Sequence, residues 1–481
     1  MKEKPRPLPP LGLSLIPVLV LVVLLFLTIR IFGSDALSGG SQIILLTSTA
    51  ICSFIAILFC GAQWKEIESS IANNIFGVST AMLILLMVGA LAGSWMISGV
   101  VPTLIYYGLK ILHPTFFLPA CCVICALVSV MTGSSWTTIA TIGIALLGIG
   151  EAQGFPVGWV AGAIISGAYF GDKVSPLSDT TVLAASITST PLFTHIRYLM
   201  YTTIPSLILS LILFTIAGFV IETTDAAHIA NFSSLLTERF VISPWLLIVP
   251  VATGILIAKK LPSIITLFLS AALAGLFALL FQPALLHEIA GPEGGLFKGL
   301  LITYYGATAL ETGNAALNDL VATRGMAGMM NTIWLILCAM CFGGAMTGTR
   351  MLQSITGSLI TFMKNRVSMV GTTVVSGIFL NIFTADQYIS IILSAEMYKD
   401  IYKKKGFESR LLSRTIEDSV TVTSVLIPWN TCGMTQATVL GVSTWTYLPY
   451  CFFNLLSPLV SVLVAISGYK IKQLITDNEK D

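Results

Sequence analysis

GDKVSPLSDTT, residues Gly171–Thr181, decides the fold of this chain together with SRTIEDS, residues Ser413–Ser419. Each run places carboxylates and hydroxyls beside long apolar segments. A carboxylate at the centre of a membrane-spanning helix costs roughly 2.5–3.5 kcal/mol, so it usually handles an ion, a proton or a charged substrate. The two runs lie in opposite halves of the chain and predict one site built twice.

Composition sets the class of protein. The 481 residues are 55% hydrophobic and 10% charged, with a mean hydropathy of +0.90. Soluble domains carry about 25% charged residues. These values predict an all-α, polytopic membrane protein whose surroundings are the lipid bilayer. A formal net charge of +2, with no basic patch interleaved with aromatics, indicates no nucleic-acid partner.

Apolar segments of about 20 residues can span a bilayer as helices, and we expect roughly eleven to thirteen spans, some interrupted or re-entrant. The clear candidates are 11–32, 42–62, 76–98, 116–131, 196–221, 243–258, 262–283, 328–349, 367–384 and 446–468. Shorter or broken segments lie at 136–150, 155–171, 299–310, 387–397 and 420–442.

Lysines and arginines predict the orientation, because they favour cytoplasmic loops. They gather at both ends of the chain, at Lys2, Lys4, Arg6, Lys470, Lys472 and Lys480. We therefore expect both termini in the cytoplasm and an even number of spans. The expected organisation is cytoplasmic tails at 1–10 and 469–481, transmembrane repeats at 11–221 and 243–468, and a polar linker at 222–242.

Three features recur in the same order in the two halves. Gly89–Gly93 matches Gly344–Gly348 at a shift of 255 residues, Trp136 matches Asp386 at 250, and Asp172 matches Asp418 at 246. Broken apolar segments at corresponding places predict inverted-topology repeats with a binding site at their interface. A single non-repeating bundle is the alternative.

The first run predicts a helix break, because Pro176 cannot continue a helix and Gly171 permits a bend. Its candidate cation ligands are the carboxylates Asp172 and Asp179 and the hydroxyls Ser175 and Ser178. Oxygen ligands suit a hard cation such as sodium. Lys173 is expected to pair with either aspartate. A solvated loop is the alternative.

The second run predicts a matching site in the other half. Glu417 and Thr421 share one helix face, with Asp418 turned about 100° away. Arg414 can reach either carboxylate. Pro428 then ends the helix ahead of Asn430. A helix start at the cytoplasmic boundary is the alternative.

Two further polar breaks complete the candidate site. Asp386 lies between apolar stretches, with an interhelical hydrogen-bond anchor as the alternative role. Ser135 belongs to TGSSWTT, residues Thr132–Thr138, which carries five hydroxyls in seven residues. Those hydroxyls either hydrogen-bond a ligand or bond back to the helix backbone. Glu311 and Asp319 are expected in a loop with a structural or gating role.

These motifs resemble the NhaC-type sodium/proton antiporters of the ion transporter superfamily, which also resemble sodium-coupled malate/lactate antiporters. The resemblance is carried by five stretches, Gly89–Leu109, Thr132–Thr138, Gly167–Thr181, Thr384–Tyr388 and Ser413–Gly433. It implies inverted repeats, discontinuous helices and cation exchange across a bacterial cytoplasmic membrane.

Sodium/proton exchange is the predicted function. Asp172, Asp179, Asp386, Glu417 and Asp418 cannot all be ionised in one dry cavity, so such a cluster binds protons or sodium in competition. Asp172, Asp179 and Asp386 are the expected shared site, with Ser175, Ser178 and Ser135 as neutral ligands. Glu417, Asp418, Thr421 and Asn430 are the second-repeat partners, and Arg414 is a competing charge.

The alternative is transport of a small organic acid or amino acid, coupled to sodium or protons. Lys173, Arg414, Trp136 and Trp429 would then contact the solute. Nine cysteines lie mostly in spans without partner histidines, so no transition metal or other cofactor is expected. No nucleophile–base arrangement indicates an enzyme. The oligomeric state stays open between a monomer and a homodimer.

Overall fold

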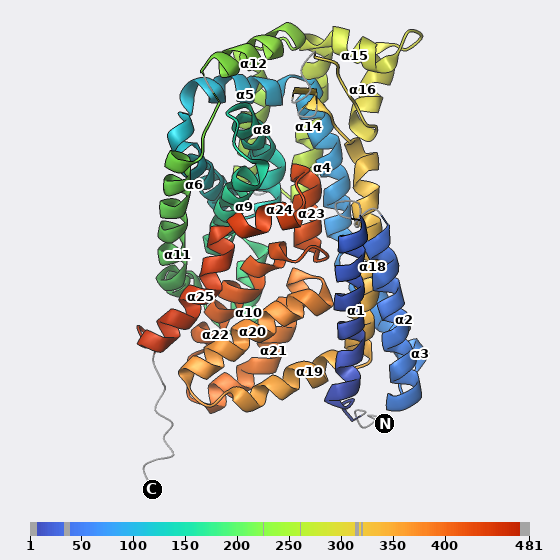
Figure 1. Ribbon diagram of the computed structural model, residues 1–481, viewed down its shortest axis with the longest axis vertical. Coiled ribbons are helices and arrows are strands. Elements are labelled where there is room, and N and C mark those ends of the chain that lie inside the picture. Colours follow the sequence, from blue (N-terminus) through green and yellow to red (C-terminus); the bar gives the residue numbers. More distant parts are fainter. Residues whose placement is uncertain are drawn as a thin grey trace.

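The computed structural model describes residues 7–32, 39–224, 226–259, 261–312, 317–318 and 321–471. Within these ranges the chain is helical, apart from loops and one isolated antiparallel bridge between Thr308 and Thr323. Figure 1 shows an elongated helical bundle in which α1 begins and α25 ends in the lower half of the view. The expected all-α class is confirmed. The basic residues Lys2, Lys4, Arg6, Lys472 and Lys480, and also Asp319, lie outside the described residues.

Nine helices of the described chain are long and apolar enough to cross a membrane, and two bent pairs bring the number to eleven. The nine are Leu11–Phe32, Gly40–Cys60, Trp64–Ile97, Pro114–Thr132, Ser135–Ala152, Leu192–Val220, Ser263–Phe281, Gly325–Gly348 and Arg366–Thr384. The bent pairs are Ile229–Arg239 with Pro244–Ala258, and Thr444–Tyr450 with Phe452–Ser467. The chain is therefore polytopic. The expected range of eleven to thirteen is met only at its lower end.

The first half is built around helix breaks. Its helices are α1 (Leu11–Phe32), α2 (Gly40–Cys60), α3 (Trp64–Gly77), α4 (Ser79–Ile97), α5 (Val100–Ile111), α6 (Pro114–Thr132), α7 (Ser135–Thr138), α8 (Ile144–Ala152), α9 (Val157–Val174), α10 (Asp179–Ile187) and α11 (Leu192–Val220). A π-helical turn at Ile139–Gly143 joins α7 to α8. Gly133, at φ +67°, ends α6, and the Ser175–Pro176 segment separates α9 from α10.

The second half also contains helix breaks. Its helices are α12 (Ala226–Arg239), α13 (Ile248–Ala258), α14 (Ser263–Phe281), α15 (Pro283–Ala290), α16 (Leu296–Tyr305), α18 (Gly325–Gly348), α19 (Met351–Leu359), α20 (Arg366–Thr384), α21 (Gln387–Lys404), α22 (Ser409–Ile416), α23 (Thr431–Leu440), α24 (Thr444–Tyr447) and α25 (Phe452–Ser467). Ala385, at φ +56°, ends α20. A π-helical turn at Glu417–Thr421 continues α22, and Pro428 lies in the break before α23.

The breaks of the two halves correspond at a constant shift. Ser134 and Asp386 cap α7 and α21, while Ser178 and Asn430 cap α10 and α23. Both pairs are separated by 252 residues (386 minus 134, and 430 minus 178). The breaks follow one another in the same order in the two halves, whereas the predicted match of Gly89–Gly93 with Gly344–Gly348 lies inside α4 and α18. The predicted matches of Trp136 with Asp386 and of Asp172 with Asp418 are wrong by a few positions.

Glycines bring α6 and α9 into close contact. A Cβ on Gly171 would lie 2.4 Å from the Ala126 carbonyl oxygen of α6, and one on Gly167 would lie 2.0 Å from that of Cys122. Gly171 has helical geometry inside α9. The expected bend at Gly171 is therefore wrong, because this glycine serves close packing and the helix ends later, at Ser175–Pro176.

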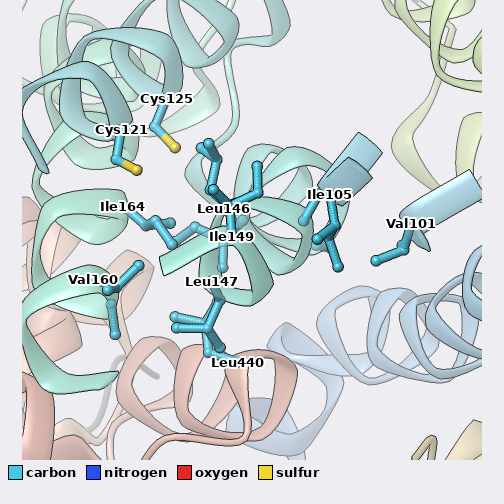
Figure 2. Packing of buried hydrophobic residues seen from close by; sticks show 14 of the residues in the cluster. Val101, Ile105, Cys121, Cys125, Leu146, Leu147, Ile149, Val160, Ile164 and Leu440 are labelled. Carbon is cyan, nitrogen blue, oxygen red and sulfur yellow. The ribbon is translucent and has the colours of Figure 1, made fainter. Parts of the chain in front are cut away.

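A buried apolar cluster holds these helices in place. Figure 2 shows Cys121 and Cys125 of α6, Ile149 of α8 and Ile164 of α9 among its side chains, with Leu440 of α23 beside them. Lipid tails are as apolar as these side chains, so close van der Waals packing between the helices is what stabilises the cluster within a membrane. The helices that end at the breaks thus pack against one another through this cluster.

Candidate functional site

A cavity of about 610 Å³ lies where the helix breaks of both halves meet. Its lining includes residues from the end of α6, from the last turn of α9 and from the starts of α7, α10, α21 and α23. Asp172, Asp179 and Asp386 all line it. The structure therefore brings together the three carboxylates that the sequence analysis grouped as one site.

Asp172 is positioned by the neighbouring break. It belongs to the last turn of α9 and is 6% exposed. Its Oδ2 accepts hydrogen bonds from the Ser135 hydroxyl at 2.7 Å and from the Ser135 backbone N–H at 3.2 Å. Its Oδ1 has no hydrogen-bond partner among the described residues. One oxygen of this buried carboxylate is thus fixed, and the other is available to a ligand.

Asp386 caps a helix and also lines the cavity. Its Oδ1 accepts a hydrogen bond from the Ile389 N–H at 3.0 Å, and its Oδ2 accepts one from the Thr431 hydroxyl at 3.0 Å. The Thr431 N–H donates to the Ala385 carbonyl at 2.8 Å. These contacts join the two breaks of the second half. Asp386 therefore combines the anchoring role and the site position that the sequence analysis weighed as alternatives.

Asp179 links the two halves. It is the first residue of α10, after the N-cap Ser178. Its Oδ2 accepts a hydrogen bond from the Tyr388 hydroxyl of α21 at 2.9 Å. Asp179 is the exposed member of the three carboxylates. It faces the cavity from the first half, while its partner comes from the second.

The predicted neutral ligands divide into two groups. Ser135 holds Asp172, as described above. Ser175 donates to the Val130 carbonyl at 2.8 Å, and the Ser178 hydroxyl accepts from the Thr181 N–H at 3.4 Å. Neither Ser175 nor Ser178 lines the cavity. Both serines thus shape the break, and the Ser178 side chain also interacts with the Asp172 carboxyl.

Lys173 belongs to a second, fully buried cluster. It forms a salt bridge and hydrogen bond with Asp418 and donates to the Ser457 hydroxyl at 2.9 Å. Asp418 also accepts from the Thr202 hydroxyl at 2.9 Å. The Arg414 Nε lies 3.7 Å from the Asp418 Oδ2. The expected pairing of Lys173 with Asp172 or Asp179 is wrong, because adjacent residues of α9 face different neighbours.

Glu417 and Thr421 lie at the two ends of a π-helical turn. Both are fully buried, and neither the Glu417 carboxylate nor the Thr421 hydroxyl has a hydrogen-bond partner among the described residues. Glu417 interacts electrostatically with Lys173, Asp172 and Asp418. It therefore lies near members of both the cavity and the buried ion-pair cluster. Single π-helical turns occur frequently at functional sites.

The remaining predicted residues have distinct positions. Trp136 lines the cavity. Trp429 does not, and its indole N–H donates to the Ile382 carbonyl at 2.9 Å. Asn430 caps α23 and donates to the Asn381 carbonyl at 3.1 Å. Arg414, which lies 4.7 Å above the Tyr198 ring, is buried away from the cavity.

Sequence reasoning missed six polar residues that line the cavity: Thr80, Ser263, Thr266, Gln387, Tyr388 and Thr431. The last three lie inside the polar motifs, next to predicted site residues, whereas the first three lie in apolar segments that gave no signal. The side chains of all six contribute oxygen atoms of the kind that bind a hard cation. Among the described residues, no three His, Cys, Asp or Glu side chains are close enough to share one metal ion. A sodium ion would therefore be held by few carboxylates, completed by hydroxyl, amide or backbone oxygens.

Comparison with known proteins gives consistent matches. The profile described as the Na+/H+ antiporter family matches residues 167–469. The malate-2H(+)/Na(+)-lactate antiporter of Bacillus subtilis is 36% identical over 453 residues, 94% of this chain and 94% of that protein. The Na(+)/H(+) antiporter NhaC of the same organism is 34% identical over 412 residues, 85% and 88% of the two chains. The arginine/ornithine antiporter ArcD of Halobacterium salinarum is 32% identical over 471 residues, 97% and 94%.

Proposed function

The chain belongs to the Na+/H+ antiporter family, and from this premise we propose that it exchanges sodium ions for protons across a cell membrane. The cavity that contains Asp172, Asp179 and Asp386 is the proposed transport site. The observation that carries the proposal is the free Oδ1 of Asp172, a buried carboxylate oxygen without a hydrogen-bond partner among the described residues.

Competition between the two cargo ions follows from that geometry. Ser135 holds one oxygen of Asp172, so the other can accept either a proton or a sodium ion, but not both. Sodium is a hard cation that prefers oxygen ligands, and the cavity lining offers hydroxyls and carboxylates. Mutually exclusive binding at one site converts movement of one ion into countermovement of the other.

Alternating access is the second part of the proposal. Tyr388 with Asp179, and Lys173 with Asp418, each join one half of the chain to the other. The constant shift of 252 residues between helix breaks supports two repeats, which we propose to be inverted in topology. Rocking of one repeat against the other would expose the cavity to each side of the membrane in turn.

We propose a bacterial inner membrane as the location, with both termini in the cytoplasm. The basic residues at the two ends of the sequence support this orientation. Fusions of green fluorescent protein and of alkaline phosphatase to each terminus test it. Both fluorescent fusions should be bright and both phosphatase fusions inactive. An active phosphatase at either end contradicts the orientation.

Replacement of Asp172 tests the site. Asp172→Asn removes the carboxylate while keeping its size, so sodium-driven proton movement in everted vesicles should disappear. Asp400→Asn is the matched control, because Asp400 is exposed on α21 and does not line the cavity. Normal exchange by Asp172→Asn at normal protein levels would contradict the assignment of Asp172 to the transport site.

Coupled transport of a small organic acid or amino acid is the second candidate function. A cavity of about 610 Å³ favours it, since pockets for organic ligands occupy about 300–1,000 Å³. Lys173, Arg414 and Trp429, the expected contacts of an organic anion, do not line this cavity. Proton flux in liposomes that requires an organic solute besides sodium would favour this candidate over plain exchange.

A further inference from the structure

We infer that the cavity also accepts a small organic cation that carries one or two ammonium groups. This inference rests on the proposed function, because it takes the cavity as the transport site. It names the class of organic solute. The names of the relatives do not agree on this class, because one names carboxylic acids and another names basic amino acids.

The charge of the lining is the first argument. Three carboxylates line the cavity, and its lining among the described residues contains no Lys, Arg or His. An organic anion there would meet carboxylates of the same sign, with no cationic side chain of the described lining to offset them. An ammonium group instead gains an opposite charge at each carboxylate. Lys173, the cationic side chain expected to pair with Asp172 or Asp179, is paired with Asp418 instead.

The spacing of the carboxylates is the second argument. No three acidic, Cys or His side chains of the described chain converge on one point. A single sodium ion therefore cannot satisfy all three carboxylates of the cavity at once. A solute with separated ammonium groups can meet two of them. The free Oδ1 of Asp172, on a side chain that is 6% exposed, is the first such point.

Aromatic side chains provide the third argument. Trp136 and Tyr388 line the cavity together with the carboxylates. A cation near the face of a tryptophan or tyrosine ring is attracted by the ring quadrupole. The methylene groups of an organic amine also gain apolar contact with such rings. This combination of rings and carboxylates suits an ammonium group on a short carbon chain better than a bare ion.

Counterflow in liposomes containing the purified full-length protein tests the inference. The vesicles are loaded with unlabelled butane-1,4-diamine, and labelled diamine is supplied outside at the same pH, which removes the pH-driven accumulation of amines. Labelled diamine should enter about tenfold faster than into protein-free vesicles. Excess sodium or unlabelled diamine should suppress the entry. Butane-1,4-diol and butanedioate have the same carbon chain with no charge and with two negative charges, and they should not compete.

Variants locate the effect. Asp179→Asn should reduce diamine counterflow about tenfold, because one carboxylate of the cavity is lost. Asp400→Asn should stay within about twofold of the unmodified protein. Equal counterflow in the two variants would overturn the assignment to this cavity.

The same vesicles separate this inference from the proposed function. Sodium-driven proton flux without diamine counterflow overturns the inference and leaves sodium/proton exchange intact. Counterflow of butanedioate in place of the diamine overturns the inference in favour of an organic anion. Diamine counterflow without sodium-driven proton flux supports the inference and overturns sodium/proton exchange. Absence of both activities at normal protein levels overturns both.

Discussion

At the scale of single residues, Asp418 is a buried carboxylate surrounded by several cationic and hydroxyl side chains. It is fully buried and faces two fully buried cations, Lys173 and Arg414. Thr202 and Ser457 also approach the same carboxylate oxygen, at 2.9 and 3.4 Å. A buried ion pair adds little net stability, but removing one partner leaves an uncompensated charge that costs about 3–5 kcal/mol. The severity of a substitution in this cluster should therefore depend on how many charges it leaves unpaired.

Asp418→Asn should destabilise the protein more than Lys173→Met. The first change leaves two buried cations without their shared carboxylate, at a cost of about 3–5 kcal/mol in unfolding free energy. The second leaves Asp418 with Arg414, whose Nε is 3.7 Å from the carboxylate. Thermal unfolding in detergent, followed by size-exclusion chromatography, measures both. A Lys173→Met protein as unstable as Asp418→Asn, or less stable, would contradict this account.

At the scale of elements, the breaks are held against one another. A Cβ on Gly133 would lie 2.6 Å from the Leu177 carbonyl carbon, so the break after α6 touches the break after α9. In the second half, the Thr431 N–H donates to the Ala385 carbonyl across the corresponding pair of breaks. The cavity is thus lined by helix breaks that contact each other within each half.

Gly133→Ala should disrupt the protein more than Gly61→Ala. The two glycines have similar backbone geometry, at φ +67° and +65°, but nothing lies within 4 Å of a Cβ on Gly61. Both variants suffer the strain of a left-handed residue, about 1–2 kcal/mol, and only Gly133→Ala also pushes two breaks apart. Unfolding temperature and sodium-driven proton flux are the measurements. Equal losses in the two variants would show that the contact with Leu177 is unimportant.

At the scale of the whole molecule, transport depends on both halves sharing one cavity. Asp172 and Asp179 come from the first half, and Asp386 from the second. If protons and sodium compete for this one site, each ion must weaken the binding of the other to the same extent.

The apparent KM for sodium should therefore rise as the pH falls. Where the site is mostly protonated, exchange of one proton for one sodium ion predicts an increase of about tenfold per pH unit. Initial rates of exchange in liposomes, measured over a range of sodium concentrations at several pH values, give this slope. A KM for sodium that stays constant throughout an acidic range in which exchange persists is the contradictory result.

Much of the architecture could be predicted from residues alone. Pro176 and Pro428 lie within polar runs and mark helix breaks, because proline lacks the donor that a helix needs. Prolines in apolar surroundings do not have this effect, since Pro17, Pro119, Pro205 and Pro458 lie inside helices. Long apolar segments between them predict spans for the same local reason. The position of Asp386 between apolar stretches likewise predicted a buried carboxylate, and Asp386 is buried beside the cavity. The Asn318 side-chain amide donates a hydrogen bond to the Glu311 carboxylate at 2.9 Å, but residues 313–316 and Asp319 lie outside the described part of the chain, so the expected loop stays a prediction.

The assignment of partners could not be predicted in this way. Asp172 and Lys173 are neighbours in the sequence, yet successive residues of a helix point about 100° apart. Asp172 therefore faces the cavity, while Lys173 meets Asp418, 245 residues further along the chain. The partner of Ser175 could not be predicted from the sequence either, since its hydroxyl donates to a backbone carbonyl of α6.

The sequence by itself determined that the chain crosses a membrane repeatedly, and where its helices break, because hydropathy and helix-breaking residues act locally. The grouping of Asp172, Asp179 and Asp386 was predicted from the sequence, but only the tertiary structure decided that they line one cavity and that Asp418 is the carboxylate neutralised by buried cations. These choices depend on the packing of segments hundreds of residues apart, where glycines such as Gly171 set how closely the helices approach.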